Sequence, residues 1–188
     1  MQRPLFLTGM MGCGKTTVGH VLAQARGWPL VDLDQRIERM FGMPIPELFE
    51  AGESAFREHE RAALESLLAE PGLAARAVVV ATGGGAVLDP RSRDAMDRVG
   101  VRVYLEVGVD EIVRRLRPTV DADQGARPLL GGEAASLRQR VAVLLASRRS
   151  AYRAGALVID AATDPAAVAE RVIVGLGEDA DIRDSEAV

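Results

Sequence analysis

Short apolar segments alternate with longer amphipathic segments along this chain. The apolar segments, of four or five residues each, lie at residues 5–8, 30–33, 78–81, 101–105 and 156–159. Strands that are apolar on both sides are covered on both faces of their sheet, as in parallel sheets flanked by helices. The pattern therefore predicts a three-layer α/β/α fold around a five-stranded parallel sheet.

Helical periodicity fills most of the segments between these strands. A first helix is expected from about Gly14 to Ala25, because Gly27 and Pro29 then stop it. After the second strand comes a helical insertion at residues 34–70, with helices at 35–41, 45–51 and 54–69, and later helices are expected at 135–153 and 165–176. Segments that follow parallel strands carry ligands, so we expect the insertion to bind a second substrate.

The length of the chain and its irregular segments predict a single domain over residues 1–177. At 188 residues, 48% of them hydrophobic, the chain suffices for one core and is short for two. Residues 117–133 are rich in proline, glycine and aspartate without periodicity, which favours a lid loop. The acidic tail at residues 178–188 is aperiodic, and we expect it to be disordered.

Charge and composition exclude several classes of protein. A net charge of −4 argues against a nucleic-acid partner, and the apolar runs are far shorter than the roughly 20 residues that span a bilayer. The single cysteine, Cys13, has no intrachain partner for a disulfide. The first residues leave no room for a signal peptide before the first strand. We expect a cytoplasmic monomer without nucleic-acid or membrane partners.

Residues 9–16 read Gly-Met-Met-Gly-Cys-Gly-Lys-Thr, a complete phosphate-binding loop between a strand and a helix. Its lysine, Lys15, is the only lysine of the chain. In such loops backbone N–H groups hold phosphate oxygens, the lysine reaches the β- and γ-phosphates, and the threonine hydroxyl can ligate Mg²⁺. A glycine-rich turn that only caps a helix gives no reason for a lysine there. The residues expected to bind ATP are Gly12, Cys13, Gly14, Lys15, Thr16 and Thr17, with Thr16 also on the metal.

Asp32 and Asp34 end the second strand and leave the same face of it, so both side chains can reach the phosphates. One carboxylate can anchor Mg²⁺ or its waters, and the other can accept a proton from an alcohol that attacks the γ-phosphorus. Asp34 alternatively caps the following helix.

Three consecutive glycines, Gly83, Gly84 and Gly85, follow the third strand and favour close approach of the backbone to a ligand. Among the many arginines, context selects Arg57, Arg127 and Arg148. Glu60 lies three residues after Arg57 on one helical face and is expected to hold it through an ion pair. His20 and His59 lack metal-ligand spacing and are interpreted as structural or surface residues.

Five strings of this sequence together resemble the shikimate kinase family over nearly the whole chain, up to about Ala161. They are the loop at residues 9–19 with its Thr-Val-Gly continuation, Asp32-Leu33-Asp34 with Ile37-Glu38, Gly52-Glu53-x-x-Phe56-Arg57-x-x-Glu60, Thr82-Gly83-Gly84-Gly85, and Arg127-Pro128-Leu129-Leu130. The resemblance implies ATP-dependent phosphorylation of the 3-hydroxyl of shikimate, giving shikimate 3-phosphate and ADP. This reaction is a step toward chorismate and the aromatic amino acids.

The resemblance also implies roles for individual residues. Shikimate would be held by Asp34, Arg57, Gly83, Gly84, Gly85 and Arg148, with Arg57 and Arg148 on its carboxylate and Asp34 on its hydroxyls as the possible base. Lys15, Asp34 and Arg127 would be catalytic, Arg127 reaching the phosphates from the lid, while Asp32 orders the Mg²⁺ shell. Arg117 would contact adenine, and Phe49 and Phe56 resemble the aromatic wall of the pocket. The segment Arg148-Arg149-Ser150-Ala151-Tyr152 lacks the family's proline and leucine, which leaves the choice between Arg148 and Arg149 open.

Two other functions share parts of this pattern. Another small-molecule kinase of the same fold, such as a gluconate kinase, would keep the phosphate loop but is expected to lack the Gly-Glu-x-x-Phe-Arg string. A regulatory nucleotide-binding relative would have lost the acceptor chemistry, whereas Asp34, Arg57 and Arg127 are all present here.

Overall fold

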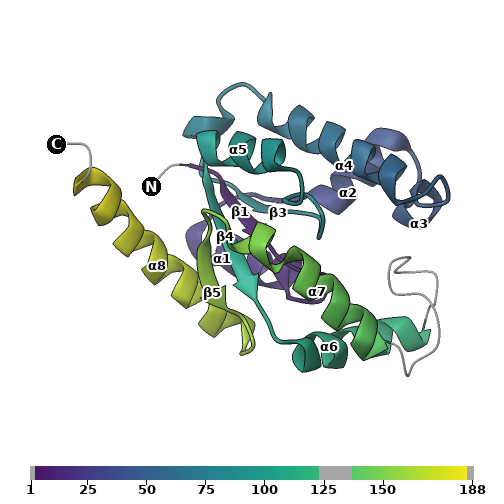
Figure 1. The fold of residues 1–188 in the computed structure, drawn as a ribbon. Coiled ribbons are helices and arrows are strands. Elements are labelled where there is room, and N and C mark those ends of the chain that lie inside the picture. The colour runs from purple at the N-terminus through teal and green to yellow at the C-terminus, as the bar shows by residue number, and fades with distance from the viewer. Residues whose placement is uncertain (1–2, 123–136, 186–188) are drawn as a thin grey trace.

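The structure, a computed structural model, describes residues 3–122 and 137–185. Its centre is a five-stranded parallel sheet with helices on both sides (Figure 1). The strands are β1 (Leu5–Thr8), β2 (Leu30–Asp32), β3 (Val79–Ala81), β4 (Val101–Glu106) and β5 (Leu157–Asp160), in the order β2-β3-β1-β4-β5. The predicted fold class is confirmed, and each strand lies within a residue or two of its expected position.

The helices pack in two layers because the chain crosses the sheet in both directions. The helices are α1 (Lys15–Arg26), α2 (Leu33–Phe41), α3 (Ile45–Leu48), α4 (Glu53–Leu68), the 3₁₀ turn η1 (Leu73–Ala75), α5 (Pro90–Val99), α6 (Val109–Ala122), α7 (Leu137–Arg153) and α8 (Pro165–Ser185). The chain moves from β1 to β2 in one direction and from β3 to β4 in the other, so right-handed crossovers put α1 and α5 on opposite faces. Helix α8 contacts α1, and α4 contacts both α2 and α5.

The three central strands β1, β3 and β4 bury nearly all of their side chains, whereas the edge strands β2 and β5 are only partly buried. One cluster of buried residues extends from Leu5 to Leu176 and includes residues of β1, β3, β4 and β5. Helix α1 can approach the sheet closely at Gly19, where an added Cβ would lie 3.0 Å from Leu30 Cδ1. The packed sheet gives the loops at its carboxyl edge a rigid base.

The register of the three neighbouring strands β2, β3 and β1 brings their carboxyl ends to one edge of the sheet. Asp32 pairs in register with Ala81, and Ala81 with Leu7. The phosphate-binding loop, Asp34 and the three glycines follow these strand ends directly. The phosphate-binding loop, Asp34 and the glycine turn are therefore neighbours in space.

The structure differs from the expectations in two of the connections. Helix α5 was not predicted, although Asp89 accepts from the Arg91 N–H and Pro90 occupies the first turn, an ordinary helix start. Helix α6 runs through Pro118 to Ala122, so residues 117–122 are helical and do not belong to an irregular lid. Residues 123–133 of the expected lid, with Arg127, lie outside the described residues.

The expected disordered tail is also corrected in part. Helix α8 does not end near Leu176 but continues to Ser185. Once a helix is formed, each further residue adds a hydrogen bond at little cost, and a single glycine, Gly177, does not stop it. Residues 186–188 lie outside the described part of the chain. Within that part, no helix has both the length and the apolar character needed to cross a membrane.

Candidate active site

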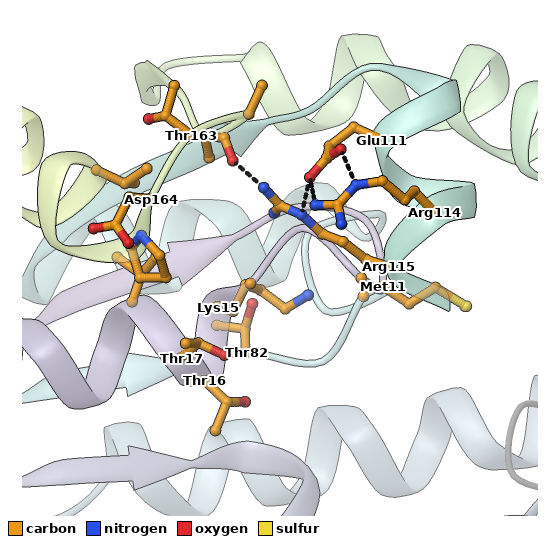
Figure 2. A pocket seen from close by; sticks show the side chains of 18 of the residues that line it. Met11, Lys15, Thr16, Thr17, Thr82, Glu111, Arg114, Arg115, Thr163 and Asp164 are labelled. Atoms are coloured by element: carbon orange, nitrogen blue, oxygen red, sulfur yellow. Dashed lines mark hydrogen bonds and ion pairs between the residues drawn. The ribbon is translucent and has the colours of Figure 1, made fainter. Parts of the chain in front are cut away.

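The phosphate-binding loop forms the floor of a cavity of about 750 Å³ at the carboxyl edge of the sheet (Figure 2). Gly14 precedes α1 with a φ of 98°, a left-handed conformation that favours glycine. The N-terminus of α1 therefore faces the cavity, as an anion site requires. Lys15 Nζ donates to the carbonyl oxygens of Gly9 at 2.9 Å and Met10 at 3.2 Å, and lies 3.9 Å from Cys13 Sγ.

Helix α6 supplies a wall of this cavity that sequence reasoning missed. Arg115 donates to Cys13 O at 3.0 Å, to Ala161 O at 2.9 Å and to Glu111 Oε1 at 2.6 Å (Figure 2). It thus ties the phosphate-binding loop to α6 and to the loop before α8. Glu111 also accepts two hydrogen bonds from Arg114, and these two arginines lower the pKa of Glu111 to about 2. The available signal was the start of α6 directly after β4, whose carboxyl end lies at the same edge.

Arg114, Arg115 and residues 161–165 also line the cavity, whereas Arg117 does not. Arg117 lies on the wall of a separate cavity, with Asp110, Val113, Arg114 and Pro118. Side chains two positions apart on an α-helix point in directions that differ by about 200°, so Arg115 and Arg117 cannot share a face. The structure does not bring Arg117 into the cavity with the predicted ATP residues.

Asp32 connects the phosphate-binding loop to helix α2. Its Oδ2 accepts from the Thr16 hydroxyl at 2.8 Å, and its Oδ1 accepts from the N–H groups of Asp34 and Gln35. Asp32, not Asp34, is therefore the N-cap of α2. Thr16 and Asp32 together present hydroxyl and carboxylate oxygens, the ligand type that Mg²⁺ prefers. No group of three or more histidine, cysteine or acidic residues that could hold a metal occurs among the described residues.

Asp34 lines the cavity together with Thr82 and Gly84. The glycine turn makes this possible, because a Cβ at Gly83 would lie 3.0 Å from Asp34 Oδ1 and would overlap Glu60 Oε1. Glu60 is buried, and this oxygen has no hydrogen-bond partner among the described residues. Gly83 is thus required by the side chains packed against it.

Arg57 is held by two carboxylates of its own helix. Its Nη1 donates to Glu60 Oε2 at 2.7 Å, which confirms the expected ion pair, and its Nη2 donates to Glu53 Oε1 at 2.8 Å. Burial opposes the charged form, but Glu60 and Glu53 outweigh it and raise the pKa of Arg57. A Cβ at Gly85 would overlap the Arg57 guanidinium. The third glycine therefore leaves the space that Arg57 occupies.

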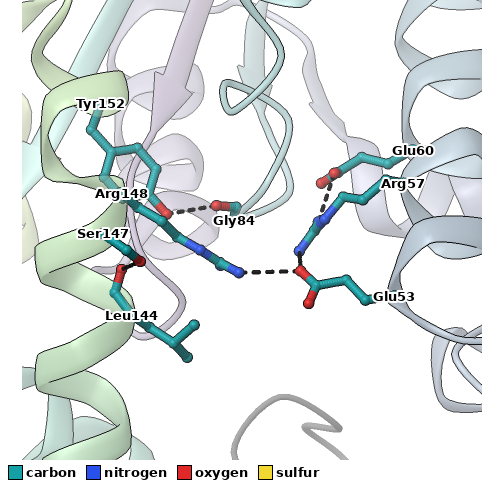
Figure 3. Close-up of polar contacts among 8 residues, drawn as sticks. All are labelled: Glu53, Arg57, Glu60, Gly84, Leu144, Ser147, Arg148 and Tyr152. Atoms are coloured by element: carbon teal, nitrogen blue, oxygen red, sulfur yellow. Dashed lines mark hydrogen bonds and ion pairs between the residues drawn. The ribbon is translucent and has the colours of Figure 1, made fainter.

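Arg148 reaches the same place from helix α7 (Figure 3). Its side chain is buried, its Nη2 donates to Glu53 Oε1 at 3.2 Å, and its Nη1 has no hydrogen-bond partner among the described residues. Arg149 instead points outward and donates to Glu106 at 3.0 Å. The geometry therefore favours Arg148 over Arg149 as the partner of Arg57.

Two aromatic contacts support these side chains. Phe49 stacks on Phe56 with ring centroids 4.1 Å apart, and the Arg57 guanidinium lies 5.4 Å from the Phe56 ring. On α7, the Tyr152 hydroxyl donates to Gly84 O at 2.6 Å and so fixes the middle of the glycine turn (Figure 3). Burial raises the pKa of Tyr152, which keeps it a hydrogen-bond donor.

The chain is similar in sequence and in fold to known shikimate kinases. The family model described as shikimate kinase matches residues 11–176. A shikimate kinase 2 from Salmonella heidelberg is 40% identical over 178 residues, covering 94% of this chain and 93% of its own. A structure of shikimate kinase from Acinetobacter baumannii in complex with shikimate superposes with a TM-score of 0.83 at 33% identity, over 95% of both chains.

A more distant structural neighbour shows how widely the fold is shared. A gluconokinase from Sinorhizobium meliloti has a TM-score of 0.65 at 18% identity, covering all of this chain and 98% of its own, a likeness of fold alone. The shikimate kinase family model matches residues 11–176, which include the phosphate-binding loop from Met11 onward, Asp34, Arg57 and Arg148. The chain therefore belongs to the shikimate kinase family.

Proposed function

We propose that this protein transfers the γ-phosphoryl group of ATP to the 3-hydroxyl of shikimate. The observation that carries the proposal is the pair of arginines, Arg57 and the buried Arg148, that meet from helices α4 and α7 next to the glycine turn after β3. Two converging guanidinium groups suit a carboxylate, which they can grip through charge-assisted hydrogen bonds. The relative from Acinetobacter baumannii, whose structure contains shikimate, supports the choice of acceptor.

On the nucleotide side, backbone N–H groups of residues 12–17 and Lys15 Nζ are proposed to hold the phosphates of ATP. The carbonyl oxygens that Lys15 now contacts lie in the loop itself, so the ammonium needs only a short movement to reach a phosphate. The fit of Thr16 and Asp32 to a hard cation supports Mg²⁺ at this end. When bound, Mg²⁺ would neutralise charge on the phosphate oxygens.

On the acceptor side, Asp34 is proposed to orient the reacting hydroxyl and to accept its proton. It borders the same cavity as Lys15 and Thr16, at the beginning of α2. Phosphoryl transfer depends mainly on positioning and charge neutralisation, so no covalent intermediate on the protein is needed. Arg127 completes the proposal as a cation that reaches the phosphates from the segment after α6.

Shikimate has to be distinguished from gluconate, which also carries a carboxylate and several hydroxyls. The stacked Phe49 and Phe56 favour a ring over an open chain, because they offer a rigid apolar surface next to Arg57. The expected compartment is the cytoplasm, since one cysteine gives no reason for an oxidising environment. The expected oligomeric state is a monomer.

The test is a coupled assay of ADP release with shikimate, with gluconate and without acceptor, each in the presence of Mg²⁺. We expect turnover with shikimate and only background release in the other two reactions. Turnover with gluconate but not with shikimate would overturn the assignment. Equal release in all three reactions would indicate a nucleotide hydrolase.

Replacing Asp34 by Asn tests the proposed base. The change keeps the size of the side chain but removes its proton affinity, so kcat is expected to fall by about a hundredfold or more. The ATP dissociation constant, measured by calorimetry, is expected to change by less than about twofold. Asp94→Asn, on the exposed face of α5, serves as the matched control. A near-normal kcat for Asp34→Asn would exclude it as the base.

A further inference from the structure

Glu53 contacts both arginines of the proposed carboxylate site. Its Oε1 accepts from Arg57 Nη2 at 2.8 Å and from Arg148 Nη2 at 3.2 Å (Figure 3). Arg57 lies four residues along the same helix, whereas Arg148 is 95 residues away on α7. A single carboxylate oxygen therefore holds together two guanidinium groups that belong to different parts of the fold.

The two arginines depend on Glu53 to different degrees. Arg57 is also fixed by Glu60, through the 2.7 Å contact of its Nη1. Arg148 has its Nη1 buried without a hydrogen-bond partner among the described residues, although 94% of the residue is removed from solvent. Such an unsatisfied, charged donor costs free energy and indicates that a further acceptor belongs there.

The position of Glu53 allows its side chain to move away from Arg57 and Arg148. It is the first residue of α4, directly after Gly52, whose φ of 97° lies in the left-handed region. Its side chain is 45% exposed, compared with 7% for Arg148. A half-exposed glutamate can turn into water at little cost, because its carboxylate is rehydrated there. Glu53 is thus the mobile partner of this three-residue cluster and the two arginines are its fixed part.

We propose that Glu53 is an internal substitute for the substrate carboxylate. It holds Arg57 and Arg148 together before shikimate binds and is displaced when shikimate binds; this inference rests on the function proposed above. A ligand carboxylate offers two oxygens, which can satisfy both Nη2 groups and the unpaired Nη1 of Arg148. Glu53 cannot keep its place beside that ligand, because two carboxylates on the same donors repel each other.

The displacement has a measurable consequence. If Glu53 occupies the arginines for most of the time, the apparent dissociation constant of shikimate rises in inverse proportion to the fraction of molecules that are open. Removing the charge of Glu53 should then tighten substrate binding. A purely structural role predicts the opposite, since losing a scaffold contact would weaken binding.

The test is Glu53→Gln, titrated with shikimate by calorimetry without nucleotide. We expect the dissociation constant to fall by roughly twofold to tenfold. Glu65→Gln is the matched control. Glu65 lies on the same helix but outside the cluster, and its carboxylate is 3.7 Å from the Arg61 guanidinium. The melting temperature gives a second readout: saturating shikimate should raise it more in Glu53→Gln than in the wild type.

Weaker or unchanged shikimate binding by both Glu53→Gln and Glu53→Ala would overturn the inference. Glu53→Ala, at the same exposed position, is expected to change affinity in the same direction and covers the case in which the glutamine amide keeps one of the contacts. The neutral carboxamide of shikimate distinguishes a failure of the carboxylate site from a failure of the role of Glu53. A wild type that binds the acid no better than the carboxamide would contradict the carboxylate site itself. A wild type that prefers the acid, together with Glu53→Gln and Glu53→Ala variants that both gain nothing, would contradict only the role of Glu53.

Discussion

The two sides of the candidate active site are built in opposite ways. The phosphate side comes from one continuous segment, residues 9–17, whose backbone and single lysine face the cavity. The acceptor side is assembled from side chains of α2, α4 and α7 and from the glycine turn after β3. The first is specified locally by a turn and a helix start, and the second exists only once distant segments have folded together.

This difference decides how each side responds to substitution. Backbone donors cannot be removed by replacing side chains. Within residues 9–17, substitutions therefore change the phosphate contacts mainly through the side chains of Lys15 and Thr16. The acceptor side consists of charged groups within hydrogen-bond distance of each other, such as Arg57 with Glu53 and Glu60. There, a single change alters several contacts at once, and effects of neighbouring substitutions are not additive.

The largest effect is expected from Lys15→Met, which removes the only cationic side chain of the loop. Charge that develops on the transferred phosphoryl group would lose its closest ammonium, so kcat should fall by roughly a thousandfold. Arg26→Met, at the exposed end of the same helix, is the charge-matched control. The coupled ADP-release assay measures both variants. A Lys15→Met enzyme within tenfold of the wild type would remove the lysine from the mechanism.

The phosphate side could be predicted from the sequence almost completely. Residues 9–16 form a motif whose residue spacing predicts the conformation of the loop. The strand before it and the helix after it were predicted from apolar and amphipathic patterns. Arg115 escaped prediction because nothing in its neighbourhood is unusual for an exposed helix. Its role comes from contacts with Cys13 and Ala161, 102 and 46 residues away.

A smaller effect, confined to the acceptor side, is expected from Gly85→Ala. The new Cβ would overlap the Arg57 guanidinium and push it from its position between Glu53 and Glu60. The KM for shikimate should rise by about tenfold or more, while the KM for ATP stays within about twofold. Gly108→Ala is the control, because no atom lies within 4 Å of its added Cβ. Equal losses for both substrates would show that the two sides are not separable.

The acceptor side was predicted in part: the residues themselves indicated a proton-accepting Asp34 and a glycine turn close to a ligand, and the family resemblance supplied the carboxylate-binding roles of Arg57 and Arg148. The sequence alone gave Arg57 with Glu60, a contact within one turn of a helix, and left Arg148 and Arg149 undecided. The structure separates these two arginines by burial: α7 turns Arg148 inward and Arg149 toward Glu106. Glu53 was visible only as part of a motif, because its contact with Arg148 spans 95 residues.

The smallest effect is expected for Glu111→Gln, on the wall that ties α6 to the phosphate loop. Arg114 and Arg115 lower the pKa of Glu111 from 4.5 to about 2, so its stabilisation is complete above about pH 4.5 and disappears as the pH falls through 2. Because Arg114 is exposed, the free energy of unfolding should differ by no more than about 1 kcal/mol.

Urea unfolding at pH 7, 5 and 2.5 measures this difference. The gap between wild type and Glu111→Gln should be the same at pH 7 and 5 and smaller at pH 2.5. Glu65→Gln again provides the control, as an exposed glutamate that pairs within its own helix. A gap that does not depend on pH would contradict the ionic origin of the stabilisation.

The central claim is that the two sides of the site are built separately. The most direct test is to measure, for variants on each side, the binding of ATP in the presence of Mg²⁺ and the binding of shikimate. Lys15→Met and Arg148→Ala are titrated by calorimetry with each ligand, next to Arg149→Ala as control and Arg148→Lys in case the buried alanine variant does not fold. The account predicts that Lys15→Met weakens ATP binding and spares shikimate, whereas Arg148→Ala weakens shikimate binding by about tenfold or more and spares ATP. An Arg149→Ala variant that loses more shikimate affinity than Arg148→Ala, or an Arg148→Ala variant that loses ATP instead, would contradict it.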